Sequence, residues 1–108
     1  MKIVLRVDGQ EKTYKKDFVE GIVFRKALEL NKKIRESGKI GEVETYDEYI
    51  DFIVFAFGNQ FTSEDAWNGL SVAQIQTEPT RIFTEVLSLG GLATHQADEG
   101  EEGNETGK

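Results

Sequence analysis

The chain has 108 residues, of which 38% are hydrophobic and 31% are charged, no cysteine, and a formal net charge of −7. It is long enough for one domain with a modest core, whereas the lack of cysteine excludes disulfides and thiol chemistry and the excess of acids opposes nucleic-acid binding. Because no apolar run approaches the roughly 20 residues that cross a bilayer, we expect a cytoplasmic protein with no nucleic-acid or membrane partner.

The first 15 residues predict a β-hairpin. Apolar residues alternate with polar ones in the first strand and so share one face: Ile3, Leu5 and Val7. Asp8 and Gly9 tolerate the positive φ angles of a tight turn, and the returning strand brings Tyr14 to the apolar side. Because two strands alone are marginally stable in water, we expect helices to cover the apolar face of the hairpin at residues 3–15.

Residues 19–37 have the periodicity of an amphipathic helix. Apolar side chains recur at spacings of three and four and form one stripe: Val19, Val23, Ala27, Leu30 and Ile34. Charged side chains occupy the opposite side of this segment. Gly38 follows the last turn, where a left-handed cap costs little, so the pattern predicts that the first helix ends there.

Capping signals locate two further helices. Thr45 and Glu48 have the spacing of a capping box, which predicts a second helix at 46–57, and Gly58 follows its last turn. Two successive hydroxyl residues, Thr62 and Ser63, then offer a cap for a short third helix at 63–69.

Pro79 decides where the last helix begins. The apolar residues between 72 and 89 would align on one continuous helix. Proline, however, lacks an amide hydrogen, clashes with the preceding turn and biases the residue before it away from helical angles. We therefore expect a turn near 72–76 and a final helix at 78–89 with Thr77 as its cap.

These elements predict an α+β, mainly α fold, with an N-terminal β-hairpin packed on a small bundle of three to four helices. Residues 1–91 would form this single globular domain. From residue 94 onward the chain is rich in Gly, Glu, Asn and Asp without apolar spacing. That composition predicts an acidic, disordered tail at 94–108.

The residues that could carry chemistry do not form a catalytic or metal-binding pattern. His95 is the single histidine and has no second ligand at useful spacing. The acids Asp47, Glu48 and Asp51 share the solvated face of a helix, and residues 38–41 lack the spacing of a phosphate-binding loop. We predict that the protein is not an enzyme and has no catalytic residue, cofactor site or metal site.

Aromatic residues are the candidates for partner binding. On the second helix, Phe55 falls opposite Tyr46, on the arc of the acids, and Phe52 lies between that arc and the apolar stripe. Either this helix is covered on both sides, or Phe52 and Phe55 form an exposed patch that anchors a partner. Trp67 is the third candidate, although its position favours a core role that fixes the short third helix to the body.

One string of residues resembles a known family. The sequence Phe-Gly-Asn-Gln-Phe-Thr at 57–62, followed by Trp67, is similar to that of small tail assembly chaperones of long-tailed phages that infect Gram-positive bacteria. The basic-aromatic return of the hairpin at 11–14 and the helical segment at 24–30 resemble the same family. The resemblance covers about residues 1–91.

This resemblance implies a non-enzymatic function. Such chaperones bind the tape measure protein, keep it soluble in the host cytoplasm, assist tail-tube assembly and are lost before the virion is complete. The tail-tube protein would be a second partner, and weak self-association along the client is expected. Phe52, Phe55 and Trp67 are then the candidate contacts to the client.

The acidic charge leaves an alternative open, a small regulatory or inhibitor protein that binds another protein. A mimic of nucleic acid would distribute its carboxylates along one ordered surface, whereas five acids lie in the predicted tail. Deletion of residues 94–108 separates the two hypotheses, because a mimic that uses the tail would fail and a chaperone that uses its helices would not.

Overall fold

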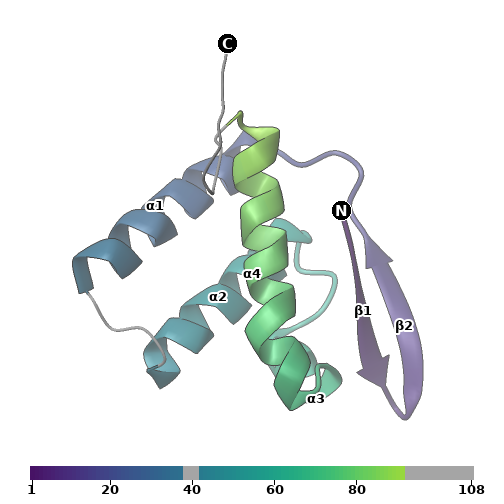
Figure 1. Ribbon diagram of the computed structural model, residues 1–108. Coiled ribbons are helices and arrows are strands. Elements are labelled where there is room, and N and C mark those ends of the chain that lie inside the picture. The colour runs from purple at the N-terminus through teal and green to yellow at the C-terminus, as the bar shows by residue number, and fades with distance from the viewer. Residues whose placement is uncertain (38–41, 92–108) are drawn as a thin grey trace.

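The computed structural model describes residues 1–37 and 42–91. An antiparallel hairpin is followed by four helices (Figure 1), which confirms the predicted α+β, mainly α fold. The elements are β1 (Lys2–Val7), β2 (Gln10–Lys15), α1 (Gly21–Ser37), α2 (Val43–Ala56), α3 (Ser63–Gly69) and α4 (Val72–Leu89). The predicted tail at 94–108 and the predicted cap at Gly38 lie outside the described residues.

The hairpin has the register that its alternation predicts. Ile3 pairs with Tyr14 across the two strands, and both side chains are buried. Asp8 and Gly9 form the turn with φ angles of 53° and 78°. Positive φ at both central residues matches the right-handed twist of the strands, so this turn sets the register.

The helices bury the apolar face of the hairpin and share one core with it. In Figure 1, α4 crosses α2, with α1 on one side and the hairpin on the other. α4 packs on both α1 and α2, and α3 packs on β1. The core draws side chains from the hairpin and from all four helices, among them Leu5, Val23, Ile53, Ala66 and Ile82.

The last helix differs from the sequence-based prediction. α4 continues without interruption from Val72 to Leu89 and contains Pro79. The predicted turn at 72–76 and the predicted helix at 78–89 are therefore wrong. Thr77 is not a cap, because it lies inside α4 and its hydroxyl donates to the Ala73 carbonyl oxygen at 3.4 Å.

Two features explain why α4 tolerates the proline. The Ser71 hydroxyl accepts from the Gln74 amide at 3.2 Å, and the Gln74 side chain accepts from the Ser71 amide at 2.9 Å. This capping box stabilises the first turn. Pro79 itself is buried, so tertiary packing compensates for the hydrogen bond that its ring removes.

The start of α2 also differs from the prediction. The helix begins at Val43, and its N-cap residue Glu42 makes no side-chain capping bond. Thr45 therefore lies in the first turn and is not a cap, and the Glu48 carboxylate pairs with Lys33 on α1. The Glu48 side chain, which the local pattern predicted to form a capping box, thus makes a contact between two helices instead.

The start of α3 agrees with the prediction. The Thr62 hydroxyl accepts from the Asp65 amide at 3.0 Å, and the Asp65 carboxylate accepts from the Thr62 amide at 3.0 Å. These reciprocal bonds form the capping box. The cap is local in sequence, and α3 spans the predicted residues 63–69.

Candidate functional site

An apolar groove opens between α2, α3 and α4. Its volume is about 370 Å³, and a second hollow of about 200 Å³ adjoins it on the side of Tyr49 and Pro79. The two hollows share side chains of α2 and α4. We define the α2–α4 groove by the residues that line the larger hollow: Tyr46, Trp67, Leu70, Val72, Ile75 and Gln76.

The short α3 helix positions one wall of the α2–α4 groove. Its capping box fixes its start, and its end lies so close to β1 that a Cβ atom at Gly69 would be 2.9 Å from the Leu5 Cβ. On the α3 helix held in this way, Trp67 is partly buried against the core and lines the groove.

The first turn of α4 forms the opposite wall. The capping box at Ser71 begins α4 immediately after α3. Val72 is 83% exposed, whereas Ile75, on the next turn, is half-buried and lines both hollows. Replacing an apolar side chain this exposed costs the folded protein little stability. Val72 is therefore a suitable position at which to test binding at the groove.

The structure separates the three aromatic residues that the sequence proposed for partner binding. Phe52 is 2% exposed and packs edge-on against Phe83, with ring centroids 5.6 Å apart. Of the two alternatives that the sequence left open for Phe52, the covered helix is the one that the structure shows, because α2 is covered by α1 and by α4. Phe55 is half-buried, with the Lys26 ammonium 5.8 Å from its ring centre. Trp67 lines the groove, and its contact with a partner stays a prediction.

The sequence reasoning missed Val72 and Ile75 as groove residues. It placed both in a turn before Pro79, which hid their position on the first turns of a helix. The signal was present in the apolar alignment from 72 to 89. Tyr46 was recognised only as part of the apolar stripe of the second helix.

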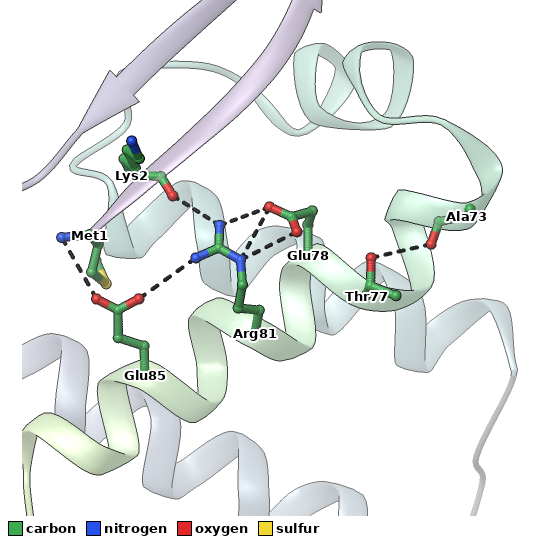
Figure 2. Close-up of polar contacts among 7 residues, drawn as sticks. All are labelled: Met1, Lys2, Ala73, Thr77, Glu78, Arg81 and Glu85. Carbon is green, nitrogen blue, oxygen red and sulfur yellow. Dashed lines mark hydrogen bonds and ion pairs between the residues drawn. The ribbon is translucent and has the colours of Figure 1, made fainter.

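A polar cluster joins α4 to the hairpin and is not part of the groove (Figure 2). The Arg81 guanidinium donates to Glu78 at 2.7 Å and to the Lys2 carbonyl oxygen at 2.9 Å. Glu85 lies 3.8 Å from both Arg81 and the Met1 amine. The hydrogen bond with Glu78 raises the pKa of Arg81, whose guanidinium is in any case charged in proteins. These contacts hold the first strand on α4.

The described part of the chain contains neither a cluster of metal ligands nor a helix that could span a membrane. Within residues 1–37 and 42–91, no group of three or more His, Asp or Glu side chains is arranged to hold a metal ion. In the same residues, no helix has the length and apolar character needed to span a bilayer. His95 lies outside this part.

Comparison with known proteins gives one match. The model of a family described as phage tail chaperone protein matches residues 1–108. No curated protein and no solved structure matches the chain. The family match covers the whole chain, and it therefore includes every element that forms the α2–α4 groove.

Proposed function

The chain belongs to the phage tail chaperone family, and from this premise we propose that it binds the tape measure protein and keeps this client soluble in the host cytoplasm. In this role it assists assembly of the tail tube, contacts the tail-tube protein and is absent from the mature virion. No catalytic step is part of the proposal.

The α2–α4 groove is the observation that supports this function. A chaperone of this kind needs apolar surface that a client segment can cover, on a body that remains soluble. Trp67, Val72 and Ile75 supply such surface, and the net charge of −7 keeps the chaperone soluble.

Burial in the groove can supply useful affinity without making the complex permanent. Each apolar side chain that is fully buried contributes roughly 1.5–3 kcal/mol. Part of this free energy is offset because binding orders the client segment and removes translational and rotational freedom from the two molecules. A few inserted side chains would thus compete with aggregation of the client and still allow release when the tail tube assembles.

The first test is co-expression of the chain with the tape measure protein. We expect the wild-type chain to raise the soluble fraction of the client and to co-purify with it. Val72→Gln should reduce the amount of co-purified client about fivefold, because it removes roughly 1 kcal/mol of apolar contact. The measurement is the ratio of client to chaperone after affinity purification.

The matched control is Phe18→Gln. Phe18 is 76% exposed and does not line the groove, so this variant removes a comparable apolar side chain elsewhere. It should behave as the wild type. An insoluble client beside well-folded wild-type chain would contradict the proposed function, and equal losses in the two variants would contradict the groove as its site.

A further inference from the structure

We infer that the α2–α4 groove selects a basic amphipathic segment, whose apolar side chains enter the groove and whose Lys or Arg residues meet carboxylates beside it. This inference rests on the proposed function, because the tape measure protein would supply the segment. Beyond the proposed function, it states which combination of charged and apolar side chains lets the groove bind one segment of a client in preference to another.

The first observation is the separation of charge along the chain. Between Glu42 and Thr80 the sequence contains eight Asp and Glu residues and no Lys or Arg. Residues 1–37 contain ten Lys and Arg residues and six acids. All the walls of the groove come from the acidic part of the chain, so a basic partner is favoured there.

The second observation is that half of these carboxylates have no partner among residues 1–37 and 42–91. Four have one: Glu48 with Lys33, Asp51 with Ser63, Asp65 with Thr62, and Glu78 with Arg81. The other four make no hydrogen bond or ion pair within residues 1–37 and 42–91: Glu42, Glu44, Asp47 and Glu64. These carboxylates can pair with a bound segment without breaking an existing contact.

The third observation is where these carboxylates lie. Glu64 precedes Trp67 by three positions on α3, a spacing that places both on one helix face. Asp47 follows Tyr46 on α2. Val43, which is 61% exposed, lies one turn before Tyr46 and extends the apolar surface. Glu64 and Asp47 thus lie within one helical turn of the groove residues Trp67 and Tyr46, although they do not line the groove, and basic side chains of an amphipathic segment bound there could reach them.

The two kinds of group would have different effects on binding. Apolar insertion supplies most of the affinity, whereas exposed carboxylates mainly raise the association rate and disfavour acidic segments. Attraction between exposed charges weakens as salt increases. A basic segment should therefore bind less tightly at high salt, and a segment without apolar side chains should bind poorly at any salt concentration.

Trp67 provides a direct reporter because it is the single tryptophan of the chain and lines the groove. The probes are three synthetic peptides of equal length, made of Leu and Lys, of Leu and Glu, and of Ser and Lys. We expect the Leu/Lys peptide to shift the Trp67 emission, with an affinity that falls as salt rises. The Leu/Glu peptide should bind at least tenfold more weakly, and the Ser/Lys peptide should not shift the emission.

Paired variants test the named carboxylates. The double variant Glu64→Gln with Asp47→Asn should weaken Leu/Lys binding severalfold. The control Glu11→Gln with Glu36→Gln removes the same charge from the hairpin and α1, and should bind as the wild type. Circular dichroism checks that all variants fold. Equal weakening in the two double variants would overturn the inference, because it would indicate attraction to the net charge alone.

The outcomes separate this inference from the proposed function. If the client is kept soluble but the Leu/Glu peptide binds as tightly as the Leu/Lys peptide, the basic preference is wrong and the chaperone function stands. If the Leu/Lys peptide binds selectively but the client stays insoluble, the chemistry of the groove is supported and the proposed function is contradicted.

Discussion

Tyr49 illustrates how tertiary packing changes the properties of a single residue. Its ring packs edge-on against Phe83 at 5.4 Å between centroids, and burial raises the pKa of its phenol. The folded state therefore holds the phenolic proton more tightly than the unfolded chain does. The resulting stability is fully present below the unfolded pKa of about 10 and is lost as pH rises through the folded pKa.

We therefore expect Tyr49→Phe to reduce the loss of stability in alkaline solution. The free energy of unfolding of the wild type should fall as pH rises above about 10, and it should fall less steeply in the variant, which has no phenol to ionise. Urea denaturation at a series of pH values measures both slopes. Identical slopes in the wild type and in Tyr49→Phe would contradict this prediction.

Among the elements, α4 depends most clearly on how its first turn is stabilised. Pro79 cannot donate the backbone hydrogen bond that its position in a helix requires. Ser71 and Gln74 satisfy amides at the start of the helix through their capping box. The residues before Pro79 can therefore remain helical and present Val72 and Ile75 to the groove.

Two substitutions distinguish a helix that begins after Ser71 from one that begins after Thr77. Ser71→Ala should lower the free energy of unfolding by about 1 kcal/mol, because it removes the cap. Thr77→Ala should change it by no more than about 0.5 kcal/mol, since this exposed side chain bonds only within the helix. Urea denaturation measures both values. A larger loss for Thr77→Ala would favour the shorter helix.

At the scale of the whole molecule, two contacts add to the shared core in joining the hairpin to the helices. One is the polar cluster around Arg81, which reaches the Lys2 carbonyl oxygen (Figure 2). The other is the close approach of α3 to β1, where a Cβ atom at Gly69 would lie 3.1 Å from the Arg6 carbonyl oxygen. Because α3 also carries Trp67, the docking of the hairpin helps to set the shape of the groove.

Gly69→Ala should therefore destabilise the whole fold. The added methyl group meets Leu5 and the β1 backbone, and such overpacking typically costs about 1–3 kcal/mol. Gly21→Ala is the control, because a Cβ atom there meets nothing within 4 Å and alanine favours a helix. Thermal denaturation compares the two variants with the wild type. A Gly69→Ala protein as stable as Gly21→Ala would show that α3 can move away from β1 without cost.

Several features of this protein follow from short stretches of sequence. The Asp8-Gly9 turn, the alternation of the first strand and the capping box at Thr62 each depend on residues that are neighbours in the chain, and the predictions made from them agree with the structure. The family resemblance also came from a short string at 57–62, and the family match supports it. Trp67, for which the sequence favoured a core role, packs partly buried against the core and also lines the groove, and its contact with a partner stays a prediction.

The sequence by itself thus determined the mainly helical fold with its hairpin, because local turns, caps and periodicity specify those elements. Only the tertiary structure decided that α4 continues through Pro79, that Phe52 is buried and that α2, α3 and α4 enclose a groove. Each of these outcomes depends on contacts between segments far apart in the chain. The burial energy of such contacts can outweigh the local preference of a segment for helix or turn. This energy cannot be read from a short stretch of sequence, because it arises between distant segments.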